Sequence, residues 1–266
     1  MKTIQPKLLV ILLLFVQSIY AQNLWESIPF PDTAAYIMCM STNIDGDIYI
    51  GTGENAKNGG LYKSGAPYST WELIFNTGHF ITTAVASSSE YVFLGKRGSD
   101  TFLISADKGN TWTPKSLPPY TDTDVISILY HTDGSLYIGT GSSPYSYPLL
   151  IRSYDMGDTW ESLCLVDSAS SSSVQDIMVT DEGDIYFCVD GYFEGLGGVY
   201  RSVDDGITWD FIGLQNHMVR SLDVNNEGDI IAGSWGGADF NAMGIFLLEK
   251  NEIEWQRILY GQIQSC

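Results

Sequence analysis

The chain has 266 residues, of which 44% are hydrophobic and 17% charged, so it can bury a substantial core and is not typical of a disordered protein. Its 32 acidic residues outnumber the 13 basic ones, for a formal charge of −19. This excess of carboxylates disfavours nucleic acid and anionic membrane surfaces as partners, because phosphate groups are bound by Lys and Arg.

The first 21 residues are typical of a secretory signal. Lys2 and Lys7 supply a positive start, and the apolar run over residues 8–16 is too short for a stable membrane span. Ala21 ends a plausible cleavage region. We therefore expect a signal peptide over 1–21 and a secreted or periplasmic chain over 22–266, with no membrane span after cleavage. An uncleaved N-terminal anchor is the alternative.

Cysteine and histidine usage predicts neither a metal site nor a cofactor. Cys39, Cys164 and Cys188 lie in apolar, strand-like runs, where a free cysteine behaves as a small hydrophobe. No Cys/His spacing indicates zinc, and no phosphate-binding loop is present. Since export permits disulfides, Cys39 with Cys266 is the one pairing to test.

Six tryptophans recur at intervals of 41 to 49 residues, at positions 25, 71, 112, 160, 209 and 255. Three of them end an octapeptide with the pattern S-x-D-x-G-x-T-W. Its serine, aspartate, glycine and tryptophan are Ser105, Asp107, Gly109 and Trp112; Ser153, Asp155, Gly157 and Trp160; and Ser202, Asp204, Gly206 and Trp209. Aspartate bonds nearby backbone N–H groups and glycine accepts a conformation that a Cβ disfavours, so the pattern predicts a tight turn between strands.

The same order of short segments precedes each octapeptide position. A strand-like run is followed by a tight turn (IDGD, SSSE, TDGS, DEGD, NEGD), a second strand, a glycine-rich loop and a third strand. The first strands are predicted at residues 36–41, 81–86, 125–130, 174–179 and 219–224. Four short strands per unit, without helical periodicity, predict an all-β fold: a β-propeller of four-stranded antiparallel blades, with five readable blades.

Two ways of closing the ring remain open at this point. The LWESI segment near residue 25 resembles a lone fourth strand, and residues 263–266 resemble the opening of a first strand. Either five blades close and these terminal strands patch the seam, or the sequence is a fragment of a ring of six or more blades.

The octapeptide resembles the Asp-box, or BNR repeat, of the sialidase-like superfamily, and the resemblance covers about residues 24–260. Similar repeats occur in sortilin-type receptors, xyloglucanases and photosystem II assembly-factor-like proteins. The resemblance implies a propeller in which the box residues are structural and lie away from the active site. It is far less specific for function, because one fold carries many functions.

Candidate ligand-binding residues lie in the loops and crossovers of the face opposite the octapeptides. They are Glu54, Tyr145, Tyr147, Asp190, Tyr192, Glu194, Trp235 and Asp239. Aromatic rings beside carboxylates suit a sugar, whose C–H faces stack on rings while its hydroxyls bond carboxylates. The alternative is that these rings only pack the loops onto the ring of blades.

Catalytic residues cannot be identified in the sequence. The sialidase resemblance would require three converging arginines, a tyrosine nucleophile beside a glutamate, and an aspartate acid/base, but the F/Y-R-I-P motif is absent. Arg152 and Arg201 precede the octapeptide serine in matching positions and are predicted as strand residues, which leaves Arg97, Arg220 and Arg257. Another glycosidase would need two carboxylates across a cleft, and no pair stands out.

The sequence therefore predicts a secreted binding module for a glycan or an extracellular protein, without catalysis. The alternative is a polysaccharide-active glycoside hydrolase whose active site is not fully visible in this chain. An extracellular sensor or an assembly factor is a third class.

Overall fold

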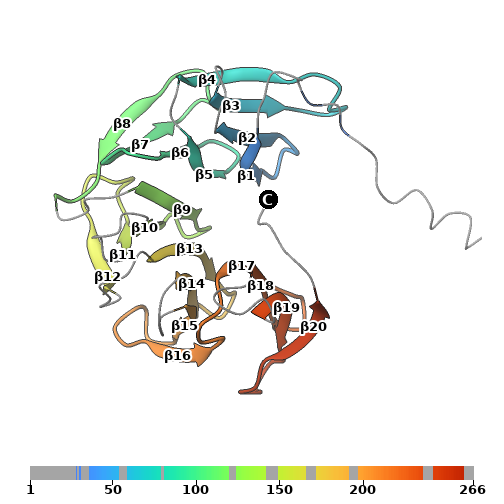
Figure 1. Cartoon of the computed structure of the whole chain (residues 1–266). Coiled ribbons are helices and arrows are strands. Elements are labelled where there is room, and N and C mark those ends of the chain that lie inside the picture. The colour runs from blue at the N-terminus through green and yellow to red at the C-terminus, as the bar shows by residue number, and fades with distance from the viewer. Residues whose placement is uncertain are drawn as a thin grey trace, which may run out of the picture.

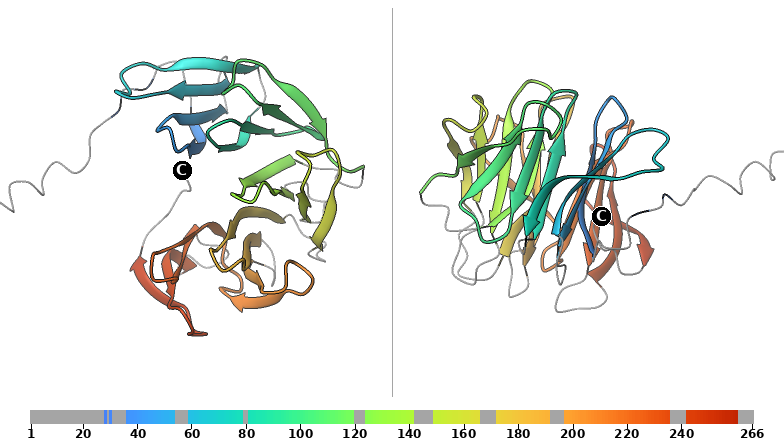
Figure 2. Two further views of the ribbon diagram at one scale, coloured as in Figure 1. Left: turned by 180° about the vertical axis from the view of Figure 1, so that it is seen from behind. Right: turned by 90° about the horizontal axis from the view of Figure 1, so that it is seen from above.

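The computed structural model describes residues 28, 30, 36–53, 59–78, 81–119, 124–141, 149–165, 172–191, 197–235 and 242–260. The strands form five antiparallel blades of four strands that radiate about a common axis, with the first strand of each blade innermost (Figures 1 and 2); blades 3 and 4 are joined into one eight-stranded sheet by the pairing of Gly141 with Ser173. The predicted all-β propeller is confirmed, and the first strands lie within two residues of their predicted bounds.

Each blade is a simple up-and-down meander. Blade 1 is β1 (Tyr36–Thr42), β2 (Ile48–Gly53), β3 (Gly59–Ser64) and β4 (Glu72–Gly78). Blade 2 is β5 (Thr82–Ser87), β6 (Val92–Lys96), β7 (Thr101–Ser105) and β8 (Thr113–Ser116). Blade 3 is β9 (Asp124–Tyr130), β10 (Leu136–Gly141), β11 (Leu149–Ser153) and β12 (Glu161–Leu165). Blade 4 is β13 (Ser172–Val179), β14 (Ile185–Gly191), β15 (Gly198–Ser202) and β16 (Asp210–Gly213). Blade 5 is β17 (Val219–Val224), β18 (Ile230–Trp235), β19 (Met243–Leu248) and β20 (Gln256–Tyr260).

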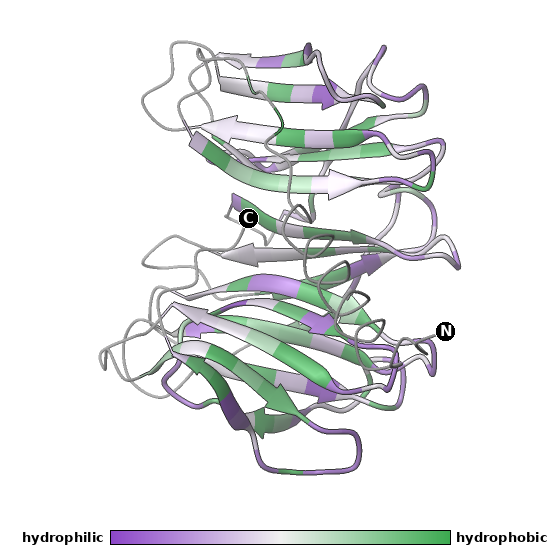
Figure 3. Cartoon of the chain, turned by 90° about the vertical axis from the view of Figure 1, so that its right-hand side faces the viewer, coloured by the Kyte–Doolittle hydropathy of each residue, from purple (hydrophilic) through white to green (hydrophobic). Residues whose placement is uncertain are grey.

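The hydrophobic core lies between blades rather than within them. Apolar residues occupy the strands and polar ones the turns (Figure 3). Each of the four core clusters spans two neighbouring blades; one, for example, joins Phe93 and Phe102 of blade 2 to Ile138 and Ile151 of blade 3. Because both faces of a blade are covered, its middle strands read as nearly continuous apolar runs such as LYIG.

A glycine at one register of the second strand lets the blades approach closely. A Cβ built on Gly139 would lie 2.3 Å from Ser127 Oγ and 2.6 Å from Val174 Cγ1 of the next blade. A Cβ on Gly95 would likewise lie 2.6 Å from Val125 Cγ1. Gly51 of blade 1 occupies the same register, whereas blade 4 has Cys188 there, so close packing requires a glycine at this register in blades 1, 2 and 3.

The three octapeptides form the same hydrogen-bonded turn. In the first, Ser105 Oγ donates to Asp107 Oδ1 (2.8 Å) and accepts from Gly109 N (2.7 Å), while Thr111 donates from both its backbone N and its hydroxyl to the Asp107 carboxylate (2.7 Å each). The second and third copies repeat these four bonds. The fourth strand then begins immediately after the tryptophan.

Ion pairs place the octapeptide turns on the same rim as the turns between first and second strands. Lys108 of the blade 2 octapeptide contacts Asp45 of the blade 1 turn (Nζ–Oδ2 2.7 Å). Lys250, at the corresponding turn of blade 5, contacts Glu182 of the blade 4 turn (Nζ–Oε1 2.9 Å). The second strands therefore end, and the third strands begin, at the opposite face.

The ring is open between blade 5 and blade 1 in the part of the chain that the structure describes. The innermost strands contact one another in the order β1, β5, β9, β13 and β17, without a comparable contact from β17–β20 to β1–β4. Ile37 of β1 is accordingly 49% exposed, whereas Val125, Val174 and Val219 at the same register are 0% exposed. The two terminal segments predicted to bear on ring closure lie outside the described residues.

Cys39, Cys164 and Cys188 are free thiols, and Cys266 lies outside the described residues, so its pairing with Cys39 stays a prediction. Burial raises the pKa of the Cys39 thiol to about 12 and that of Cys164 to about 11. Such thiols are unreactive, as expected of cysteines that pack as small hydrophobes. Within the described ranges, no helix is long and apolar enough to cross a membrane.

Candidate functional site

Only two of the eight predicted ligand-binding residues belong to the described structure. Glu54, Tyr145, Tyr147, Tyr192, Glu194 and Asp239 lie outside it. Asp190 and Trp235 were predicted in loops, but they lie within strands β14 and β18. Strands β14 and β18 extend further than predicted, because Asp190 pairs with Ser173 and Trp235 pairs with Met243 at the strand ends.

Asp190 and Trp235 meet at a third residue, Arg220 of β17. The Arg220 guanidinium lies 3.3 Å from Asp190 (Nη2–Oδ2) and 5.8 Å from the centre of the Trp235 ring. Backbone contacts of Met218 with both residues hold the start of β17 between β14 and β18. The fold thus brings Asp190 and Trp235 together around Arg220. In the sequence, Arg220 was only one of the arginines left after Arg152 and Arg201 were assigned to strands.

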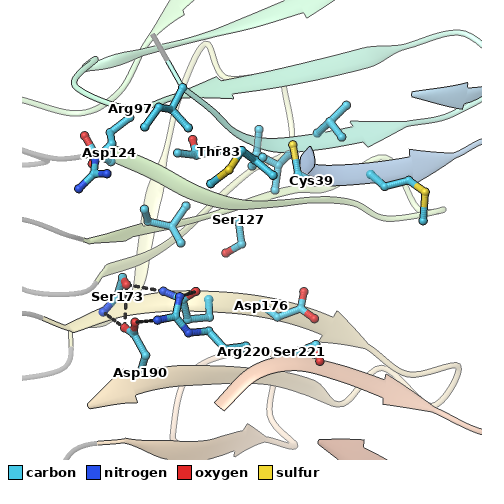
Figure 4. A pocket seen from close by; sticks show the side chains of 18 residues that line it. Cys39, Thr83, Arg97, Asp124, Ser127, Ser173, Asp176, Asp190, Arg220 and Ser221 are labelled. Carbon is cyan, nitrogen blue, oxygen red and sulfur yellow. Dashed lines mark hydrogen bonds and ion pairs between the residues drawn. The ribbon is translucent and has the colours of Figure 1, made fainter. Parts of the chain in front are cut away.

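Asp190 and Arg220 line one side of a pocket on the propeller axis, and Trp235 lies behind Arg220 outside the lining. The pocket encloses about 380 Å³, and we call it the axial pocket. The innermost strands β1, β5, β9, β13 and β17 supply most of its walls, and Arg97 and Asp190 add side chains from second strands or the loops that follow them (Figure 4).

A β-bulge at one register of every first strand directs a side chain to this pocket. In each blade the pairing with the second strand skips one residue, and the skipped residue lines the pocket. These bulge residues are Met38, Thr83, Ile126, Gln175 and Arg220. Bulges are frequent beside functional sites because they re-aim a side chain without ending the strand.

The wall formed by blades 4 and 5 is polar, and a chain of hydrogen bonds links its side chains. Arg220 Nη1 donates to Gln175 Oε1 (3.0 Å), and Gln175 Nε2 donates to Ser173 Oγ (2.5 Å). Ser173 in turn donates from its backbone N (2.9 Å) and its hydroxyl (2.8 Å) to Asp190 Oδ1. This network fixes the orientation of the Arg220 guanidinium in the absence of a ligand.

The wall formed by blades 1 to 3 is mainly aliphatic. Met38, Met40, Ile81, Ile126 and Ile128 lie along it. The Arg97–Asp124 ion pair (Nε–Oδ2 3.4 Å) lies at the edge of this wall, and Asp124 also accepts from the backbone N of Gly98. The axial pocket is therefore amphipathic across its width.

Asp176 is the most perturbed carboxyl group in the pocket. Burial raises its pKa to about 6, even though its oxygens accept from the backbone N of Leu222 (2.8 Å) and of Ile177 (2.9 Å). Burial also raises the pKa of Asp190, against the lowering effect of Arg220. Because both oxygens of Asp176 are engaged by backbone donors, its geometry is that of a structural carboxylate that ties β13 to β17.

The arginines do not form the triad that sialidase chemistry would require. Arg97 and Arg220 line the pocket, but Arg152 on β11 contacts Asp205 and Glu161, and Arg201 on β15 contacts Asp184. Both therefore lie in third strands, where the sequence placed them. In the ranges that the structure describes, no group of His, Cys, Asp and Glu could hold a metal ion.

Comparison with known proteins matches this geometry to solved structures, all of them β-propellers. YCF48 bound to D1 peptide matches at a TM-score of 0.62 and 18% identity, over 90% of this chain and 71% of that one. A virginiamycin B lyase from Staphylococcus aureus with quinupristin matches at 0.67 and 17%, over 91% and 77%. An ancestral GH74 enzyme matches at 0.63 and 17%, over 88% of this chain but 33% of that chain.

The chain is a β-propeller. At identities this low the likeness shows the fold alone, and the matched propellers include both enzymes and binding proteins. No family model matches the chain, and neither does any curated protein.

Proposed function

We propose that this chain is an exported Asp-box propeller that acts as a binding module and holds its ligand in the axial pocket. The observation that carries the proposal is the Arg220 guanidinium, which Gln175, Asp190 and Trp235 orient at the wall of a pocket. A pocket that combines an aliphatic wall with a few polar groups of fixed orientation is the usual composition of a ligand site. The three identical octapeptide turns support the Asp-box assignment, and residues 1–21 support export.

Binding fits the pocket better than hydrolysis does. A glycoside hydrolase needs one carboxyl group that delivers a proton and a second carboxylate facing it. Asp124 and Asp190 are each paired with an arginine, and both oxygens of Asp176 are held by backbone N–H groups. These three carboxylates are engaged in ways that orient neighbours rather than transfer protons.

A ligand screen with a pocket variant tests this proposal. The mature chain would be applied to a glycan array and to a peptide library, in parallel with Arg220→Met. We expect at least one ligand whose binding falls at least tenfold in the variant, and no turnover on a panel of polysaccharides. Turnover on that panel, lost when Asp176 or Asp190 becomes asparagine, would establish the hydrolase alternative instead.

A further inference from the structure

The bulge residues indicate what kind of ligand the axial pocket accepts. We infer that it binds a peptide segment, with an uncharged main-chain amide against Arg220 and Gln175 and an aliphatic side chain against the opposite wall. This inference rests on the proposed function and names the partner of the same site.

The first step is the charge of the pocket. Arg220 is paired with Asp190 (3.3 Å), and Arg97 is paired with Asp124 (3.4 Å). Each guanidinium thus has a carboxylate partner, and Asp176 adds a further acid. A phosphate, sulfate or carboxylate ligand needs a cation that is not already neutralised. The pocket offers none among its described residues, and the chain as a whole carries a charge of −19.

The second step is the supply of donors and acceptors. A main-chain amide presents one N–H donor and one C=O acceptor without net charge. Arg220 has five N–H donors, and its hydrogen bonds to Gln175 and Asp190 leave donors for a carbonyl oxygen. The Asp190 carboxylate, which has about four lone-pair sites, can accept from an amide N–H beside it. The polar wall therefore complements a peptide bond.

The third step is the aliphatic wall, which faces this network. Met38 and Ile126 are the bulge residues there, and Ile81 and Ile128 lie beside them. The unbranched methionine adapts to irregular shapes and so can pack against side chains of different form. A sugar ring would instead need an aromatic face, and the described lining contains no aromatic residue. These features favour an aliphatic side chain over a glycan.

Capped tetrapeptides provide the test. Peptides acetylated and amidated at their ends, with Leu, Ala, Asp or Lys at a central position, would be titrated into the mature chain and followed by NMR chemical shifts. We expect the Leu peptides to bind most tightly, and the same peptides with a free carboxyl end to bind no tighter than the amides. Arg220→Met should weaken binding at least tenfold, and Met38→Gln should remove the preference for Leu over Ala.

Matched controls separate the pocket from general damage to the fold. Arg201→Met removes an arginine that is also paired with an aspartate and lies over a tyrosine ring, but that does not line the pocket. Met243→Gln is the control for Met38→Gln, since Met243 is also outside the pocket lining. Neither control should change peptide affinity, and circular dichroism would verify that all four variants are folded.

The outcomes distinguish the two levels of the proposal. Two outcomes would overturn the peptide inference: peptides with a free carboxyl end bind tenfold tighter than the amides, or only glycans bind. If binding depends on Arg220 in either case, the proposal that the chain is a binding module is retained. If no ligand depends on Arg220, the proposed function itself fails. Leu selectivity that disappears in Met38→Gln and persists in Met243→Gln supports the inference.

Discussion

Ser127 donates its hydroxyl to the backbone carbonyl of Val174, 2.9 Å away in the next blade. The bond joins the first strands of blades 3 and 4 at the propeller axis. Similar bonds link the other blades: Thr83 donates to the carbonyl of Val125, and the Cys39 thiol lies 3.8 Å from the carbonyl of Thr82. Between blades 4 and 5 the direction is reversed, because the Asp176 carboxylate accepts from the backbone N of Leu222.

Burial of the Asp176 carboxyl group, which outweighs this hydrogen bond, predicts a pH dependence specific to Asp176. Its folded pKa, about 6, lies above its unfolded value of about 3.8, so the carboxyl group favours the folded state most at low pH. As the pH rises from 4 to 6.5, the stability of the wild type relative to Asp176→Asn should fall by about 2 kcal/mol. Urea unfolding of both proteins across this range measures the difference, and a constant or rising difference would contradict the prediction.

The octapeptide aspartates predict the opposite sign. Hydrogen bonds from the side chain and backbone of Thr159 lower the pKa of Asp155 to about 2. The stability that this carboxylate contributes is therefore present above pH 3.8 and is lost as the pH falls towards 2. Thermal midpoints of Asp155→Asn and wild type should converge between pH 5 and pH 2.

Blade packing predicts that Gly139 cannot be replaced. A methyl group at this position would lie within 2.6 Å of Ser127 and Val174, and the strand must shift to accommodate it. We expect Gly139→Ala to destabilise the protein by about 1–3 kcal/mol. Gly65→Ala, where the Cβ would meet only the Asp47 side chain at 3.1 Å, should cost much less. Equal losses in urea unfolding would show that Gly139 does not limit the approach of the blades.

The open side of the ring predicts a contrast between equivalent positions. Ile37 is 49% exposed, whereas Val125 at the same register is 0% exposed. Val125→Ser should cost about 2–4 kcal/mol, because it removes buried methyl groups and leaves a hydroxyl in their place. Ile37→Ser should stay within about 1 kcal/mol, as expected for a substitution at a surface. A similar loss in both variants would mean that Ile37 is covered in solution.

Arg152 and Arg201 predict a second contrast, between a buried and a partly exposed arginine side chain. Both precede the octapeptide serine, but the Arg152 side chain is 5% exposed and that of Arg201 is 41% exposed. Replacement by methionine should cost about 1–2 kcal/mol at Arg152, because its buried side chain loses its contacts with the Tyr137 and Tyr154 rings while its carboxylate partners stay exposed to water, and under about 1 kcal/mol at Arg201. Chemical unfolding of the two variants measures both values, and equal costs would contradict this account.

The repeat made the fold predictable from the sequence, because each element has a residue-level cause. Tryptophan spacing gave the blades, Asp107 and its counterparts gave the turns, and the glycine represented by Gly139 marked the second strands. The site was less predictable. Asp190 and Trp235 were chosen for their chemistry, but Arg220 and Gln175 were missed because the bulge position has no fixed residue type. The signal available in the sequence was the position of the bulge residue. It directly precedes the first-strand residue that pairs with the second-strand glycine, or with the residue that replaces this glycine.

The distribution of the core between blades has a consequence for how the molecule opens. Blades 2, 3 and 4 each contribute to two core clusters, whereas blades 1 and 5 contribute to one. Stability in such an array depends on the interfaces between neighbours, so the outermost units fray first. Amide hydrogen exchange would therefore be slowest in blade 3 and quicken towards both ends. Blade 1 supplies part of the aliphatic wall of the axial pocket, and blade 5 supplies Arg220. Ligand binding would therefore slow amide hydrogen exchange in both of these outer blades.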